Sequence, residues 1–472
     1  MTPSADTTST SPTIAESLRI RFDLAHRLAR VPLATPLRRR FAGNVVFIVL
    51  GNGISQAASM LAYFAVARIL GKDAFGQFSL VQNTAIVLAG FTGCLGLTAT
   101  KHVAEYRTTD TPRAGAALSL LDTTALAAAL TMALALFLGA TPVSAAAFHA
   151  TNFAPYLRVV ALLLLFTAIT NYQSGALAGF EAYKRMNGPL LLRAAMILPL
   201  LAAGSAIAGI AGALWALTLV AAIVCLLNRR LLRQYCRAHA IRTSLRAGIK
   251  EWGILGRFSI PAFLIGIIPA PCIWLGQAML AHQSQGFAEC GAFAAAFQYR
   301  TAVAMLPGLL AAPLVPMISN IDLRGTKRQN RLIAAVCLAA LVVSGLPALV
   351  MAIFSPWFMR AYGARFAANS LVLTILASSA VISSVANPIV AALTSMGRMW
   401  HVLAVNLLWA AVFLVTASRL IPLHHASGLA SAQILADICL LASVLTVYAV
   451  SCHTASNQRL SDKPSSCEQA AV

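Results

Sequence analysis

The sequence predicts an all-α protein that crosses a membrane about twelve times, with its helices in two bundles of six. Of its 472 residues, 59% are hydrophobic and 10% are charged, which leaves too little polar surface to cover a water-soluble chain of this length. Apolar runs of about 20 residues, the length of one helical crossing, recur along the whole chain. Strands of a membrane barrel would alternate over about ten residues, and these runs show no such alternation.

The apolar runs define the individual elements, with boundaries good to a few residues. In chain order the twelve expected spans are 43–66, 77–100, 114–139, 155–178, 189–208, 210–228, 257–281, 291–318, 332–355, 367–393, 402–423 and 428–450. The longest hydrophilic connection separates the first six spans from the last six. The expected parts are a basic N-terminal tail (1–41), a six-helix bundle (42–228), a basic linker (229–256), a second six-helix bundle (257–450) and a C-terminal tail (451–472).

The basic residues predict the orientation in the membrane. The formal net charge is +21, and 28 of the 35 lysines and arginines lie in the two tails, the linker and the connections on that same side. This asymmetry is the positive-inside signal, and it predicts that both termini and the linker are cytoplasmic. The charge therefore indicates topology and acidic lipid headgroups, with no nucleic-acid partner expected.

A weak repeat supports the division into halves. The second span begins "GQFSLVQNTAIV" at Gly76, and the eighth begins "GAFAAAFQYRTAV" at Gly291. Both have a G-x-F start, then amides, then a T-A step. Both segments are expected to cross in the same direction, so a true repeat would relate the halves by an axis along the membrane normal.

The loops argue against an enzyme. A membrane glycosyltransferase working on the outer face needs a sizeable outer loop with carboxylates or histidines, and the longest outer connection has one histidine and no acid. His424 and His425 lack a third metal ligand, so we expect no metal site and no cofactor. The chain has no GxxxxGK[ST] motif for nucleotide hydrolysis. Transport without direct ATP chemistry is the favoured class.

Several stretches carry a family resemblance, chiefly "ARILGKDAFGQFSLVQ" after the first span and the paired Pro307 and Pro316 of the eighth. They resemble polysaccharide and O-antigen flippases, the Wzx-type branch of the multidrug/oligosaccharidyl-lipid/polysaccharide exporter superfamily. The resemblance covers residues 41 to about 450. It implies a MATE-like two-bundle fold with a central cavity that opens alternately to each side of a bacterial inner membrane. It also implies a lipid-linked oligosaccharide of the undecaprenyl-diphosphate type as cargo, with polysaccharide polymerase and export machinery as further partners.

Arg300 lies within the eighth span, where a charged residue is unexpected. It follows Gly291 by nine residues, so at about 1.5 Å per residue it lies roughly 13 Å deep, close to the midplane. A guanidinium there must face protein, water or an anion, and intramembrane charges are usually functional. We expect Arg300 to bind the cargo's phosphates. The alternative is a structural ion pair with Asp437, which lies at a similar depth in the twelfth span.

Polar side chains on four spans are the other expected cavity residues. The resemblance places the first, second, seventh and eighth helices around the cavity. The candidates are Asn52, Gln56, Gln82, Asn83, Gln277, Gln298 and Tyr299. Each of them alone could instead form an interhelical hydrogen bond, which contributes about 0.6 kcal/mol.

Prolines and carboxylates suggest how the transporter moves and what drives it. Pro261, Pro269 and Pro271 remove backbone donors from the seventh span and predict a bend or hinge. Asp122 and Asp437 are the carboxylates expected in the membrane, as ion-pair partners or as sites for a coupling ion. The membrane potential itself also favours moving an anion outward.

Other functions stay open at this point. They are a multidrug or ion antiporter of the same superfamily, a peptidoglycan lipid-precursor flippase, a sugar permease of another fold, and a membrane scaffold without transport. The cationic membrane charge argues against a carrier of cationic drugs, and a precursor flippase would be expected to have two more helices. A scaffold would leave Arg300 unexplained.

Overall fold

The computed structural model describes four stretches of the chain, residues 35–148, 151–241, 268–311 and 327–461. All regular structure in these stretches is helical, which confirms the predicted all-α class for the described residues. Residues 1–48 and 49–472 form separate compact units. In the first unit the described residues, 35–48, are the beginning of one helix.

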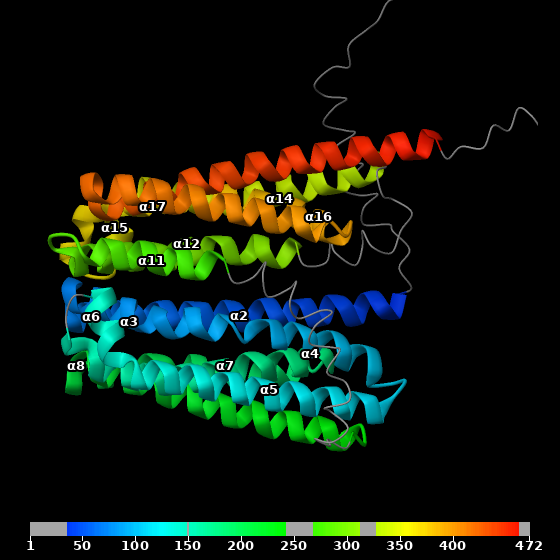
Figure 1. The fold of residues 1–472 in the computed structure, drawn as a ribbon, viewed down its shortest axis with the longest axis horizontal. Helices are drawn as coiled ribbons and strands as arrows, with labels where there is room; N and C mark the ends of the chain where they lie inside the picture. The colour runs from blue at the N-terminus through cyan, green and yellow to red at the C-terminus, as the bar shows by residue number, and fades with distance from the viewer. Residues whose placement is uncertain (1–34, 149–150, 242–267, 312–326, 462–472) are drawn as a thin grey trace, which may run out of the picture. The chain divides into compact units, whose positions relative to one another are not determined.

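The first half of the chain is a series of long helices (Figure 1). They are α2 (Thr35–Leu70), α3 (Lys72–Gly90), α4 (Gly93–Tyr106), α5 (Thr111–Leu138), the short α6 (Ala140–Phe148), a 3₁₀ turn at Thr151–Phe153, α7 (Ala154–Gly179) and α8 (Tyr183–Ala238). The start of α5 follows from its sequence, because the Asp110 side chain accepts a hydrogen bond from the Arg113 amide and Pro112 lies in the first turn. The second expected span consists of two helices, α3 and α4, because the helix is interrupted at Phe91 and Thr92.

The long helix α8 is a helical hairpin. Ala208 and Gly209 depart from helical geometry, and Gly209 has φ 58°, a conformation that favours glycine. A Cβ on Gly204 would lie 2.4 Å from the carbonyl oxygen of Gly212. Eight residues in a straight helix span about 12 Å, so this contact requires the chain to reverse. The boundary predicted between spans 189–208 and 210–228 is therefore confirmed.

The second half of the chain has the same character. Its elements are α11 (Pro269–Ala281), α12 (Gly286–Ala311), α14 (Lys327–Ile353), the short α15 (Ser355–Arg360), a 3₁₀ segment (Ala364–Asn369), α16 (Ser370–Ser395) and α17 (Met399–Ser461). Helix α17 reverses at His425, since a Cβ on Gly428 would lie 2.2 Å from the Leu420 carbonyl oxygen. This hairpin matches the expected pair of spans 402–423 and 428–450.

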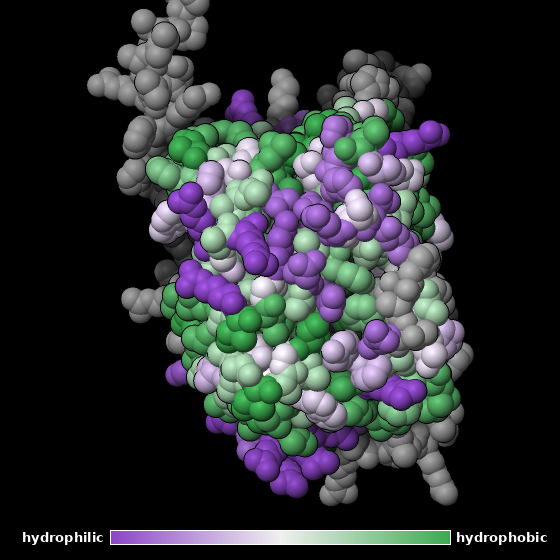
Figure 2. Space-filling view, turned by 90° about the vertical axis from the view of Figure 1, so that its left-hand side faces the viewer, coloured by the Kyte–Doolittle hydropathy of each residue, from purple (hydrophilic) through white to green (hydrophobic). Residues whose placement is uncertain are grey.

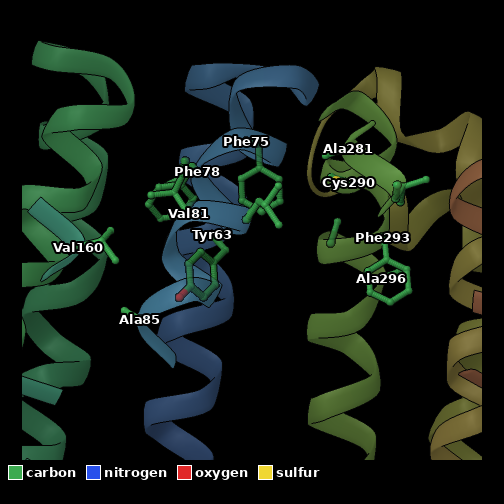
Figure 3. Packing of buried hydrophobic residues seen from close by; sticks show 14 of the residues in the cluster. Tyr63, Phe75, Phe78, Val81, Ala85, Val160, Ala281, Cys290, Phe293 and Ala296 are labelled. Carbon is green, nitrogen blue, oxygen red and sulfur yellow. The ribbon is translucent and has the colours of Figure 1, made fainter. Parts of the chain in front are cut away.

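The helices pack in two groups, one from each half. In the first group α7 contacts α3, α4, α5 and α8, and in the second α16 contacts α12, α14 and α17. The groups meet through α3, which packs along α12 and also touches α11. Figure 3 shows the interior there, with Phe78 of α3 on the side of Val160 in α7 and Phe75 on the side of α12. Both phenylalanines are almost fully buried.

The outer surface of the helices is apolar, as a membrane protein requires. Large side chains such as Leu138, Ile207 and Trp400 are 71%, 84% and 73% exposed. Within the described stretches eight helices are long and apolar enough to cross a membrane, and two of these, α8 and α17, are hairpins. The count of twelve spans stays a prediction, because the seventh and eighth spans extend beyond the described residues.

Helices extend into the predicted tails and linker. Residues 35–41 begin α2, residues 229–238 continue α8, and residues 451–461 continue α17. Charged residues such as Arg229 and Arg230 marked the end of the apolar run in the sequence. They do not end the helix, because arginine is a good helix former and the helix continues beyond the apolar zone.

Candidate functional site

Arg300 and Asp437 form an ion pair within the second group of helices. The Arg300 Nη2 atom lies 3.0 Å from the Asp437 Oδ2 atom, and the two side chains are 14% and 3% exposed. Arg300 Nε also donates to Ser379 Oγ at 3.0 Å. The guanidinium lies over the ring of Phe297, 5.3 Å from its centroid. The ion pair considered for these residues from their shared depth is therefore present.

Asp437 is the centre of this polar cluster. It accepts hydrogen bonds from Arg300 and Ser379 on one oxygen, and from Trp409 Nε1 at 2.9 Å and Gln433 Nε2 at 3.1 Å on the other. These donors come from α12, α16 and both arms of the α17 hairpin. A buried carboxylate with this many donors is well satisfied, so the pair holds three helices together and has no net charge.

Tyr299, the neighbour of Arg300, faces the packed interior. Its side chain is fully buried, and its hydroxyl donates to the Phe358 carbonyl oxygen at 2.8 Å. The ring contacts those of Phe64 and Tyr362. Tyr299 was expected to line a cavity, but the structure places it in an aromatic cluster because consecutive helical residues point about 100° apart.

Two of the predicted amides bridge the two groups of helices. Asn83 of α3 donates from Nδ2 to Gln277 Oε1 of α11 at 2.8 Å. Nearby, Trp274 Nε1 of α11 donates to Thr84 Oγ1 at 3.0 Å. Gln82 points elsewhere and donates to the Tyr63 hydroxyl at 2.6 Å. The sequence left two roles open for these amides, lining a cavity or forming an interhelical hydrogen bond. The pair forms an interhelical bond, and this bond lies at the boundary between the two halves.

The other predicted amides differ in their exposure. Gln56 of α2 and Gln298 of α12 are half-buried, and neither makes a hydrogen bond to another residue in the part of the chain that is described. Asn52 is exposed. The sequence grouped these residues by their helices. Which of them could bind a ligand depends on side-chain direction, which only the packing determines.

Arg193 is an intramembrane cation, although in the sequence it lies among the basic residues of an expected cytoplasmic connection. It lies ten residues into α8, roughly 15 Å from the start of the helix, and it reaches Ser55, which lies near the middle of the expected first span, 43–66. Its Nη1 atom donates a hydrogen bond to Ser55 Oγ of α2 at 3.1 Å. Among the described residues it has no carboxylate partner, which distinguishes it from Arg300.

Polar and backbone contacts hold the two groups together at one end of the helices. Lys72 of α3 contacts Glu289 of α12 at 3.2 Å and Asn369 at 2.8 Å, and Asn369 also donates to Glu289. Gly76 and Gly291 touch directly, because a Cβ on Gly76 would lie 2.8 Å from the Gly291 amide nitrogen. Figure 2 shows the end of the molecule that carries the hairpin turns, where hydrophilic side chains gather in the upper middle of the face. In the predicted topology this is the outer end.

The remaining predicted residues lie elsewhere. Asp122 pairs with Arg229 of α8 at the opposite end of the first group. Pro269 and Pro271 form the first turn of α11, and Pro261 and Pro316 lie outside the described residues. The described residues contain no group of three His, Cys, Asp or Glu side chains that could hold a metal ion.

Comparisons with known proteins agree with the resemblance seen in the sequence. A family model described as "Polysaccharide biosynthesis protein" matches residues 41–322. The chain is 24% identical over 389 residues to the EPS I polysaccharide export inner membrane protein EpsE of Ralstonia nicotianae, covering 78% of this chain and 85% of that protein. A second EpsE, from Ralstonia solanacearum, is 26% identical over 291 residues, 61% of this chain and 66% of that protein.

Solved structures share the fold at low sequence identity. An inward-facing multidrug resistance MATE family transporter has a TM-score of 0.70 at 13% identity, over 86% of this chain and 96% of that one. The lipid II flippase MurJ in an inward closed conformation has a TM-score of 0.67 at 10% identity, over 85% and 87%. The MATE-like fold predicted from the sequence is confirmed by these similarities.

Proposed function

The chain belongs to the polysaccharide biosynthesis protein family, and on this premise we propose that it moves a lipid-linked oligosaccharide across the inner membrane. The relatives named as polysaccharide export inner membrane proteins support export of an exopolysaccharide unit. The cargo is a sugar chain on a diphosphate lipid of the undecaprenyl type. It moves from the cytoplasmic to the outer leaflet, and the protein acts as a transporter without catalysing a reaction.

The observation that carries this proposal is an arginine in the membrane without a carboxylate partner. Arg193 contacts the Ser55 hydroxyl and has no acidic neighbour among the described residues. Keeping an unneutralised guanidinium at that depth is costly unless an anion or water reaches it. Its planar fork of donors can grip phosphate oxygens two at a time. The diphosphate of the cargo therefore binds first at Arg193.

Arg300 has a second, conditional role. Its charge is neutralised by Asp437, and Ser379 holds its Nε atom. A phosphate that approached Arg300 would have to replace Asp437 or share the guanidinium with it. The Asp437 carboxylate would retain its bonds from Trp409 and Gln433 during such an exchange. Phosphate binding at Arg300 would thus be coupled to rearrangement of α12 against α17.

Alternating access follows from where the two groups of helices touch. The contacts between Lys72 and Glu289 and between Gly76 and Gly291 close the predicted outer end. Release of the cargo outward requires these contacts to break. The bond between Asn83 and Gln277 lies further along the same boundary and must also break or exchange for sugar hydroxyls.

The membrane potential supplies the driving force in this proposal. Asp122 and Asp437, the two carboxylates considered for a coupling ion, are each paired with an arginine. Each carboxylate already has a guanidinium as its counter-ion and needs no coupling cation to neutralise it. An inside-negative potential favours outward movement of an anion by roughly 2.3 kcal/mol per charge per 100 mV.

Complementation of a strain that lacks this gene tests the proposal. Arg193→Ala removes charge-assisted bonds of about 1.5–3 kcal/mol, so export should slow by roughly 10- to 150-fold and lipid-linked oligosaccharide should accumulate. Arg193→Lys should retain part of the activity because it keeps the charge. Arg419→Ala, which removes an exposed arginine of α17, is the matched control and should export normally. Normal export by an abundant Arg193→Ala protein would refute the proposal.

A further inference from the structure

A second basic site lies in the first group of helices, apart from the boundary between the two groups. It is a cavity of about 640 Å³ between α5, α7 and α8, near the end where α5 begins and α8 stops. By the distribution of basic residues this is the cytoplasmic end. The transport mechanism proposed above uses none of its residues.

Three arginines of α8 line this cavity in a row. Arg229, Arg233 and Arg237 are spaced by four residues, which places them on one face of the helix over about 12 Å. Arg233 and Arg237 are exposed and have no acidic partner in the described part of the chain. A pair of adjacent arginines at this spacing can meet both phosphates of a diphosphate, or a single phosphate between them.

The opposite wall positions the row and adds polar groups. Asp122 of α5 pairs with Nη1 of Arg229 and so fixes the first guanidinium in place. Ser119 and Thr123, one turn apart on α5, also line the cavity with the Tyr172 ring of α7. Because one carboxylate neutralises one of the three arginines, the lining has a surplus of two positive charges.

We propose that this cavity binds a phosphate-bearing headgroup at the cytoplasmic surface of the membrane. The rest of its lining is Cys236 and three aliphatic side chains, Leu118, Leu232 and Ile241. A cavity with both a basic row and apolar walls suits the headgroup of an anionic lipid, and free pyrophosphate shares the chemistry that the arginines recognise. Basic pockets between helices on the cytoplasmic side are a known solution for acidic headgroups. Asp122 is a positioning residue for Arg229 in this site.

Binding measurements on the purified full chain test the proposal. One arm measures the shift in melting temperature with sodium pyrophosphate, and the other measures it in nanodiscs of phosphatidylcholine with or without phosphatidylglycerol. The variant Arg233→Ala/Arg237→Ala should weaken binding by about tenfold or more, since it removes charge-assisted contacts. The control Lys184→Ala/Arg230→Ala removes two exposed charges, one from each arm of the α8 hairpin at its cytoplasmic end and both outside the cavity, and should stay within about twofold of the wild type.

Each outcome decides the question. A saturable effect of pyrophosphate, of phosphatidylglycerol or of both, lost in the cavity variant and kept in the control, supports the site and identifies the source of the phosphate. Equal losses in the two variants would show that only the general surface charge matters, and the proposal would be overturned. No effect of either ligand on the wild type would overturn it as well. None of these readouts depends on transport, so failure here is distinct from failure of the flippase proposal.

Discussion

The contact between α3 and α12 predicts that one methyl group can open the outer end. In Gly76→Ala the new Cβ would lie 1.8 Å from the Phe287 carbonyl oxygen and 2.8 Å from the Gly291 amide nitrogen. Both are backbone atoms, so no side chain can turn aside. The helices must separate by roughly 1.5 Å to reach an ordinary contact distance. Overpacking of this kind costs about 1–3 kcal/mol.

That cost applies only while the two helix starts touch. A state in which they have moved apart is not affected, so the substitution should shift the equilibrium toward the outward-open state by about 5- to 150-fold. The ion pair of Lys72 with Glu289 opposes the shift, but it is partly exposed and contributes at most about 1 kcal/mol. The steric cost of the new methyl group is therefore expected to exceed the stabilisation from this ion pair.

Cys290 is a natural reporter of this opening. It is 2% exposed and precedes Gly291, so it is shielded while the outer end is closed. With the other cysteines replaced, a membrane-impermeant maleimide added outside should label Gly76→Ala faster than the parent by the factor above. Gly90→Ala, in the same helix, is the control, because a Cβ there meets nothing within 4 Å. Equal labelling of the two variants at normal abundance would refute the reasoning.

Three further predictions concern the ion pair, the prolines and the topology. Arg300→Ala and Asp437→Ala should each destabilise the protein by about 3–5 kcal/mol in thermal unfolding, and the double variant should regain much of the loss; a double variant with full transport would exclude phosphate binding at Arg300. Pro269→Ala/Pro271→Ala should insert normally but transport more slowly, and unchanged transport would exclude a hinge. A cysteine at Arg242, outside the described residues, should be labelled only from the cytoplasm, and labelling from outside would invert the topology.

Pairing of Arg300 with Asp437 could be foreseen from the sequence, because equal depth in two spans follows from helix geometry alone. Arg300 and Asp437 were each placed about nine residues from the same side of the membrane, and the structure joins them. Ser379, Trp409 and Gln433 could not be predicted in the same way. They reach Asp437 because α12, α16 and the two arms of α17 meet there, and which helices meet is a property of the fold.

Arg193 was missed for a different reason. The apolar run in the sequence begins at residue 189, which predicts that Arg193 lies near a helix end among the cytoplasmic basic residues. Helix α8 begins at Tyr183, so the same residue lies more than two turns inside. Helix boundaries are the least reliable part of a sequence-based assignment. At a membrane surface, an error of a few residues decides whether an arginine is interpreted as a cytoplasmic topology signal or as a functional residue within the membrane.

The weak repeat in the sequence coincides with a direct contact between the two halves of the chain. Gly76 and Gly291 are the first residues of the two G-x-F segments, and the structure places these two glycines against each other. Their partners in the motif, Phe78 and Phe293, are both fully buried. When two halves are related by a twofold axis, residues that lie on the axis meet their own equivalents. A glycine in each copy lets the two helices approach closely at that point, and tilting of the two halves away from each other at the outer end would break this contact.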